Sequence, residues 1–158
     1  MAFQLALTEI GELAFALHSA PGLDGAIAAD IALLKQAGVG VVVTTLTSEE
    51  LHRFQLTALG STVQNADMVW LHLPVVDKSL PAERFAAGWA DALEQLQQSA
   101  AAGERISVHC RGGTGRTGLV AAKIALALDA EFDATVAAIR AARPGALSAE
   151  AQLTYLKG

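Results

Sequence analysis

The chain has 158 residues, of which 53% are hydrophobic, and this size and composition favour one domain with a buried core. It carries 16 acidic and 11 basic residues, and the net charge of −5 argues against a broad nucleic-acid interface, which would need a basic face. A single cysteine excludes an internal disulfide and a multi-thiolate zinc site and indicates a reducing compartment, so we expect a cytoplasmic location. Glu9 and Glu12 interrupt the first apolar run, and we expect neither a signal peptide nor a membrane-spanning helix.

Strand-like and helix-like segments alternate along the chain. An unbroken apolar run or a period of two indicates a strand, and a period of three to four indicates a helix. The pattern first predicts a strand pair over residues 3–17 turning at Gly11, a helix over 25–36, a strand over 39–45 and a helix from Thr47 through Phe54. It then predicts a helical piece over 55–66 that is broken or bent near Gly60, a strand over 68–73, a helix over 81–102 and a strand over 106–108. The remaining predicted helices cover 117–128, 132–142 and 148–155.

The order of these elements indicates how the strands pair. After the first pair, helices separate consecutive strands, so crossover connections must join them into a mostly parallel sheet. We therefore expect residues 1–158 to form a single α/β domain with a twisted sheet of four to five strands and helices on both faces. Ligands of such sheets bind beyond the carboxyl ends of the strands, where the loops at Asp77 and Cys110 should meet.

One glycine-rich stretch, residues 105–119 with the sequence RISVHCRGGTGRTGL, joins a predicted strand to a predicted helix. Three of its glycines lie within four positions, and glycine permits crowded backbone conformations in which N–H groups turn toward a ligand. The helix N-terminus adds unpaired N–H donors and partial positive charge, and Arg116 adds a planar set of donors suited to phosphate oxygens. The stretch therefore predicts an anion site, and Cys110, the only cysteine, lies within it.

Two nucleotide-binding motifs compete for this loop. Gly113, Gly115 and Gly118 have the G-x-G-x-x-G spacing of a dinucleotide fingerprint, which also needs a second strand about 20 residues on that ends in an acidic residue. The acidic residues at that distance lie between two predicted helices, so this interpretation is disfavoured. A nucleotide P-loop is disfavoured further, because it would need glycine at Cys110 and lysine at Arg116.

A stricter pattern accounts for every residue of HCRGGTGRTG, residues 109–118: His-Cys, five residues, then Arg followed by Ser or Thr. It resembles the signature of the cysteine-dependent protein tyrosine phosphatase superfamily. The segment LHLPVVD, the tripeptide RPG at 143–145 and the modest length look most like the small dual-specificity class. Within that class the chain is most similar to the kinase-associated phosphatase (cyclin-dependent kinase inhibitor-like) branch and its bacterial relatives, over about residues 20–156.

The chemistry of the loop fits this family. Loop N–H donors, a helix N-terminus and Arg116 favour the thiolate of Cys110, which we expect to be the nucleophile. Phosphoryl transfer spreads negative charge over the equatorial oxygens, so the loop must supply donors aimed at them. We expect these donors to be the guanidinium of Arg116 and the backbone N–H groups of the phosphate-binding residues Arg111, Gly112, Gly113, Thr114, Gly115 and Arg116.

The resemblance implies three further roles. Asp77 is expected to donate the proton to the leaving group and later to activate water. Thr117 is expected to donate its hydroxyl to Cys110, and His109 to orient the loop through hydrogen bonds. Asp67 is the rival acid, but it precedes its strand, at the edge opposite the ligand, and is interpreted as a solvated helix-terminal residue.

Other polar residues have structural interpretations. Glu49 and Glu50 are expected to charge the first turn of a helix that Thr47 opens with a capping box, rather than to form a catalytic pair. Arg140 and Arg143 are expected to be solvated or to enrich positive charge near an anionic substrate. Three histidines show no metal-ligand spacing and are expected in loops or on the surface: His18, His52 and His72.

These residues together predict a phosphomonoester hydrolase that acts through a phosphocysteine intermediate. The expected substrate is a protein bearing phosphotyrosine, phosphoserine or phosphothreonine, or a small phosphomonoester, and phosphate, sulfate or vanadate should bind in the loop. A phosphoinositide or inositol phosphate substrate is the alternative, disfavoured because Gly112, Gly113 and Thr114 follow Arg111 where lipid-directed members of the family carry extra basic residues. We expect a monomer without metal or cofactor that binds neither nucleic acid nor membranes.

Two alternatives come from other classes. A sulfurtransferase also places a reactive cysteine in an arginine-containing loop, but such loops usually hold four residues between Cys and Arg, and this one holds five. A catalytically dead phosphoprotein-binding module would be expected to lack Cys110, Arg116 or Asp77, and all three are present.

Overall fold

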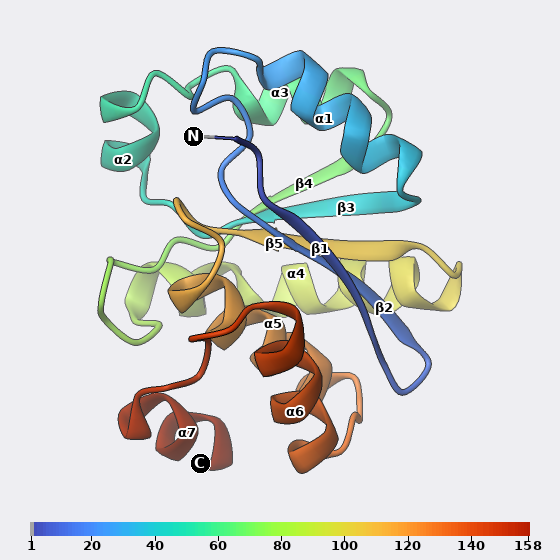
Figure 1. Cartoon of the computed structure of the whole chain (residues 1–158), viewed down its shortest axis with the longest axis vertical. Coiled ribbons are helices and arrows are strands. Elements are labelled where there is room, and N and C mark those ends of the chain that lie inside the picture. The colour runs from blue at the N-terminus through green and yellow to red at the C-terminus, as the bar shows by residue number, and fades with distance from the viewer. Residues whose placement is uncertain (1) are drawn as a thin grey trace.

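The computed structural model describes residues 2–158 and forms an α/β fold around one five-stranded sheet (Figure 1). The strands lie in the order β1-β2-β5-β3-β4; β1 pairs antiparallel with β2, and all other neighbours are parallel. This arrangement confirms the predicted mostly parallel sheet with a strand pair at its edge. The strands are β1 (Leu5–Ile10), β2 (Leu13–His18), β3 (Val39–Thr44), β4 (Val69–His72) and β5 (Arg105–His109).

Helices cover both faces of the sheet, with α1, α2 and α3 on one side and α4, α5, α6 and α7 on the other (Figure 1). Their bounds are α1 (Ile27–Gln36), α2 (Ser48–Arg53), α3 (Leu59–Asn65), α4 (Glu83–Ala101), α5 (Gly115–Ala127), α6 (Phe132–Ala142) and α7 (Glu150–Lys157). None of the helices described is both long enough and apolar enough to cross a bilayer.

The apolar run of β3 is explained by burial on both of its faces. Because successive side chains of a strand point to opposite sides, Val41 and Val43 join the core under α4, α5 and α6, whereas Val42 joins the core under α1 and α3. All three side chains are fully buried. Such two-sided burial explains why this central strand reads as continuously apolar.

Most helix ends differ from the predicted ranges by one or two residues, and the differences that matter most are at the starts of α3 and α5. The helical piece expected over 55–66 is shorter, since Gln55 adopts a left-handed conformation with φ of 59° and α3 begins only at Leu59. Gly60 does not bend this helix; it makes room for the indole of Trp70, which a Cβ atom there would approach to 2.7 Å. The helix expected from Thr117 begins two residues earlier, at Gly115, which places Arg116 in its first turn.

The parallel strands end together at one edge of the sheet. In the strand register, His109 at the end of β5 lies between His18 of β2 and Thr44 of β3, and Thr44 is in turn paired with His72 of β4. The loop after β4, which carries Asp77, and the loop after β5, which carries Cys110, therefore emerge at the same edge.

Candidate active site

The backbone of the loop from Cys110 to Arg116 turns its N–H groups inward. The carbonyl of Arg111 accepts a hydrogen bond from Ala20 N–H at 3.0 Å, and the carbonyl of Gly112 accepts one from Arg143 Nη2 at 2.9 Å. In a trans peptide the next N–H points opposite to the carbonyl, so anchoring these carbonyls on the outside directs the following N–H groups to the inside. These two contacts place the N–H groups of Gly112 and Gly113 on the inner side of the loop, an arrangement that can bind an anion.

Gly113 is the glycine on which this conformation depends. Its φ is +84°, and a Cβ atom there would come within 2.6 Å of the backbone of His18. Gly112 and Gly115 lack both features, since their φ angles are not positive and a Cβ atom would meet no other atom within 4 Å. The sequence-based explanation of crowded backbone at all three glycines is therefore correct only for Gly113.

Cys110 lies at the base of the loop with 5% of its surface exposed. Its Sγ accepts hydrogen bonds from the Thr117 hydroxyl at 3.1 Å and from Gly113 N–H at 3.3 Å. Burial alone would raise the pKa of the thiol, but these donors, the Thr117 N–H and the positive charge of Arg116 outweigh burial and lower the pKa below its ordinary value. A lowered thiol pKa favours the nucleophilic thiolate at neutral pH.

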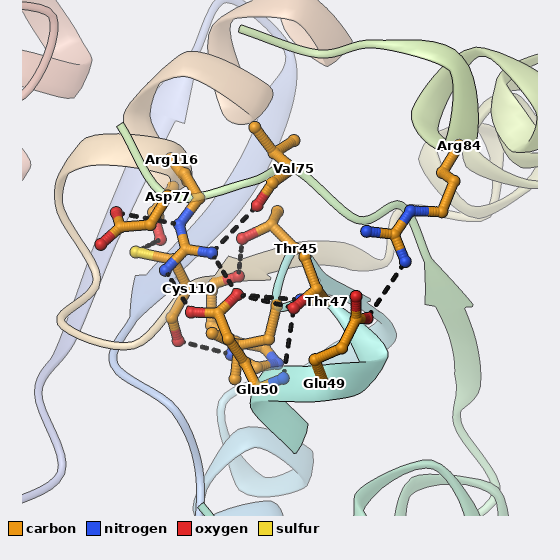
Figure 2. A network of polar contacts seen from close by, with 12 residues as sticks. Thr45, Thr47, Glu49, Glu50, Val75, Asp77, Arg84, Cys110 and Arg116 are labelled. Carbon is orange, nitrogen blue, oxygen red and sulfur yellow. Dashed lines mark hydrogen bonds and ion pairs between the residues drawn. The ribbon is translucent and has the colours of Figure 1, made fainter. Parts of the chain in front are cut away.

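Arg116 is held beside the loop by a two-pronged ion pair (Figure 2). Its Nη1 and Nη2 donate to Glu50 Oε1 at 2.7 Å and Oε2 at 3.0 Å, and Nη1 also donates to the carbonyl of Val75 at 3.0 Å. Among the described residues the buried Nε forms no hydrogen bond, and its ion-pair contact is Asp77 Oδ1 at 3.5 Å. The guanidinium has five N–H donors, so Nε–H and one Nη2–H remain for the two oxygens of a phosphate.

Glu50 is the site residue that sequence reasoning missed. Its carboxylate completes the capping box with Thr47 and at the same time holds Arg116. Burial would raise the pKa of Glu50, but hydrogen bonds from Arg116 and Thr47 outweigh it and lower the pKa. Glu49, the neighbour with which it was grouped, instead pairs with Arg84 on the surface, apart from the site (Figure 2). The capping box located Glu50, but nothing in the sequence linked it to an arginine 66 residues away.

His109 and His18 support the loop from beneath. His109 Nε2 lies 2.7 Å from Thr44 Oγ1, and its Nδ1 lies 2.9 Å from the Cys110 carbonyl. Burial lowers the pKa of His109 to about 4, so the ring is neutral at neutral pH. The expected loop or surface position of His18 is wrong: the residue ends strand β2 and is fully buried, and its ring stacks on that of His109 with centroids 5.2 Å apart.

The other two histidines differ from one another. His52 is exposed, as predicted, whereas His72 is a half-buried residue of β4 whose Nε2 lies 2.6 Å from the carbonyl of Leu46. Among the described residues, no cluster of three or more potential ligands is arranged to hold a metal ion.

Asp77 lies above the loop on the segment that follows β4, with 64% of its side chain exposed. A cavity of about 220 Å³ opens between Asp77 and the Cys110–Arg116 loop. A second cavity, of about 330 Å³, adjoins it on the Asp77 side and is walled by Leu80 and by Gln152 of α7. Asp67, the rival acid, is an exposed residue near the opposite edge, where its carbonyl lies 3.4 Å from Lys35 Nζ.

This geometry agrees with the outcome of a comparison with protein families. The model of the Tc-R-P family, described as the DSP-PTPase phosphatase of polymorphic toxin systems, matches residues 18–129. The chain belongs to this family. It is therefore a cysteine-dependent phosphatase of the dual-specificity type, and family membership favours this activity over sulfur transfer and over a catalytically dead binding module.

Solved structures share the fold of this phosphatase. Kinase associated phosphatase (KAP), with serine in place of its catalytic cysteine, superposes with a TM-score of 0.81 at 23% identity, over 99% of this chain and 93% of that one. Tk-PTP in its active form has a TM-score of 0.68 at 21% identity, over 96% and 94% of the two chains. PTPMT1 in complex with PI(5)P has a TM-score of 0.65 at 20% identity, over 96% and 92%. No curated protein matches the chain.

Proposed function

We propose that this phosphatase hydrolyses phosphotyrosine, phosphoserine or phosphothreonine in proteins through a phosphocysteine intermediate on Cys110. The observation that carries the proposal is the convergence on one small cavity of a thiol with a lowered pKa, the unpaired donors of Arg116 and the carboxyl group of Asp77. A nucleophile, a set of oxygen-binding donors and an acid are the three groups that this chemistry requires.

In the first step, the thiolate of Cys110 attacks phosphorus while the bond from phosphorus to the ester oxygen breaks. The departing oxygen takes the proton of the Asp77 carboxyl group, so an alcohol or phenol leaves. Negative charge on the three equatorial oxygens is met by the inward N–H groups of the loop and by the Nε and Nη2 donors of Arg116. The two hydrogen bonds from Arg116 to the Glu50 carboxylate keep the guanidinium in that orientation.

In the second step, the Asp77 carboxylate takes a proton from water as the water oxygen attacks phosphorus. The bond from phosphorus to sulfur breaks, and inorganic phosphate and the Cys110 thiolate result. The Thr117 hydroxyl, 3.1 Å from Sγ, stabilises the departing thiolate by donating a hydrogen bond. His109 acts on neither bond; it positions the Cys110 carbonyl.

Phosphoinositides are the second candidate substrate. The observation in their favour is the structural likeness to PTPMT1, which was solved with PI(5)P. Against it, the loop offers only Arg111 as a basic side chain before Arg116, and Gly112, Gly113 and Thr114 supply no cation for further ring phosphates. We therefore place phosphoproteins first.

A substrate panel tests the proposal. The wild-type enzyme is assayed on phosphopeptides and phosphoinositides, and Cys110→Ser and Asp77→Ala are used to retain bound substrate. We expect phosphopeptide turnover that chelators do not inhibit and that falls by roughly 10⁴-fold or more in Cys110→Ser, with phosphate binding kept. Turnover that survives Cys110→Ser would contradict the mechanism, and turnover of phosphoinositides alone would contradict the protein substrate.

A further inference from the structure

A pair of arginines stacks on one aromatic ring beside the phosphate loop. The guanidinium carbons of Arg53 and Arg111 lie 5.5 Å and 5.1 Å from the centre of the Phe54 ring. Both arginines are exposed, and the ring is half-buried against the core under α1 and α3. We call Arg53, Phe54 and Arg111 the arginine platform. The ring holds the two side chains in place and so reduces the entropy lost when they bind a ligand.

The charges of the platform are not neutralised within the described part of the chain. No described carboxylate lies within ion-pair distance of Arg53 or Arg111, whereas Arg84, Arg105 and Arg116 each have an acidic partner. Two like charges beside one ring repel each other, and an anion bound close to both would reduce that repulsion. The chain as a whole carries a net charge of −5, so this positive spot is local rather than part of a generally basic surface.

The platform is continuous with the proposed phosphate cradle. Arg111 follows Cys110 directly and lines the same cavity of about 220 Å³. Arg53 is the last residue of α2, the helix whose Glu50 holds Arg116, and Phe54, the residue after it, contacts Arg111 at the other end of the loop. An anionic group on the platform would therefore belong to a molecule whose phosphoester lies over Cys110.

The opposite side of the opening has a different chemistry. Leu80, with 37% of its surface exposed, lies three residues after Asp77 on the acid-bearing segment. The adjoining cavity of about 330 Å³ is lined by the apolar side chains of Leu80, Ala149 and Ala151 and by polar ones that include Ser148 and Gln152. A ligand that uses both sides would present an anion toward the arginines and a group with apolar and polar parts toward this cavity. Successive residues of an extended polypeptide provide both, whereas an inositol ring bears polar groups all round.

We propose that the arginine platform is a secondary anion subsite that selects phosphoproteins with a carboxylate or a second phosphate next to the phosphorylated residue. This inference rests on the proposed phosphoprotein activity and adds a sequence preference to it. The two sources of the anion, an acidic side chain and a second phosphorylation, share the chemistry that the guanidinium groups recognise.

Matched phosphopeptides test the subsite. Peptides of one sequence carry glutamate, phosphoserine, glutamine or lysine at each position flanking the phosphorylated residue, and p-nitrophenyl phosphate serves as a substrate without flanks. For the wild type, we expect kcat/KM to be about three- to fivefold higher with glutamate than with glutamine, as for an exposed ion pair, and higher still with phosphoserine. Raising the salt concentration should reduce the difference.

The Arg53→Gln variant separates the subsite from the catalytic machinery. We expect it to lose the preference for acidic flanks, while its kcat/KM for p-nitrophenyl phosphate equals that of the wild type. Lys35→Gln is the control: it removes the same charge at the end of α1, near the opposite sheet edge, and should keep the preference. Phe54→Leu keeps both charges but removes the ring, and should weaken the preference.

Two outcomes would overturn the inference while the phosphoprotein activity stands: equal kcat/KM for acidic and neutral flanks in the wild type, or an unchanged preference in Arg53→Gln. Hydrolysis of p-nitrophenyl phosphate and phosphoinositides without hydrolysis of any phosphopeptide would overturn the proposed phosphoprotein activity itself, and the subsite with it. The panel thus distinguishes failure of the subsite from failure of the function on which it rests.

Discussion

The phosphate loop, residues 110–116, and the acid loop, residues 74–80, meet at one cavity but are built in opposite ways. Cys110 is 5% exposed, and the backbone around it is anchored to the segments that follow β2, β3 and α6. Asp77 has 64% of its side chain exposed, and its recorded polar contact is Arg116 Nε at 3.5 Å. The difference fits the roles proposed for the two loops, because donors to a phosphate work best when fixed in advance, whereas an acid must remain accessible to leaving groups of different shape.

Val75 is the last anchored residue before the exposed part of the acid loop. Its side chain is buried, its N–H donates to the Thr45 carbonyl at 2.9 Å, and its own carbonyl accepts from Arg116 at 3.0 Å. The next five residues are all exposed. Asp77 is therefore anchored only two residues upstream, and substitution of Asp77 should affect chemistry without affecting folding.

The largest effect that would test this contrast is that of Asp77→Asn. We expect kcat for an unactivated phenyl phosphate to fall by about 10³-fold, because the leaving oxygen then receives no proton, and kcat for p-nitrophenyl phosphate to fall by less than about tenfold. Because Asp77 is exposed, the free energy of unfolding should stay within about 0.5 kcal/mol of the wild type. An equal loss of kcat for good and poor leaving groups would assign the acid role elsewhere.

The next largest effect is expected for Glu50→Gln, which should lower both kcat/KM and the free energy of unfolding. The Glu50 and Arg116 side chains are 10% and 5% exposed, so loss of the carboxylate leaves a buried charge unpaired and should lower the free energy of unfolding by about 3 kcal/mol. Misplacement of the guanidinium should reduce kcat/KM by roughly 10²-fold under conditions where the protein is folded. Urea denaturation and steady-state kinetics measure the two quantities.

Glu49→Gln is the matched control for that substitution. Glu49 precedes Glu50 on the same helix, but its pair with Arg84 is exposed, so neither the free energy of unfolding nor kcat/KM should change appreciably. If Glu49→Gln and Glu50→Gln changed the free energy of unfolding and kcat/KM equally, the ion pair between Glu50 and Arg116 would not contribute to the rigidity of the phosphate loop.

The smallest effect is a loss of folding stability at acidic pH, which should come from the buried histidines under the phosphate loop. Because burial lowers the pKa of His109 from 6.5 to about 4, the unfolded chain binds the extra proton between these values, and the folded state loses stability as the pH falls through them. Between pH 7 and pH 5 this should lower the free energy of unfolding by about 2 kcal/mol. Burial lowers the pKa of His18 as well, so His18 acts in the same direction.

Urea denaturation at both pH values measures this effect. His109→Gln should reduce the acid-induced loss by about the same 2 kcal/mol, whereas His52→Gln, at an exposed position, should leave the loss unchanged. A wild-type free energy of unfolding that stays constant from pH 7 to pH 5 would contradict a neutral, buried histidine pair behind the loop.

Local signals predicted most of the fold. The apolar run of β3 and the capping box that Thr47 opens are encoded within a few residues, and the structure has both. The α6 bounds agree with the predicted range of 132–142. The helix over 55–66 failed because its first part is a turn, stabilised by packing that no local pattern records. The roles assigned to Cys110, Asp77, Arg116, Thr117 and His109 stay predictions until the substitutions are measured.

The amino-acid sequence by itself determined where the phosphate loop lies, because its residues are contiguous and their spacing alone predicts a nucleophile, a donor loop and an arginine. Only the tertiary structure decided which carboxylate holds that arginine and which ring supports His109. Glu50 and Arg116 are 66 positions apart, and His18 and His109 are 91 apart, so these pairs exist only once the crossover connections have placed β2, β3 and β5 side by side. Contact across a sheet depends on strand order and register, and no short segment of the chain encodes either of them.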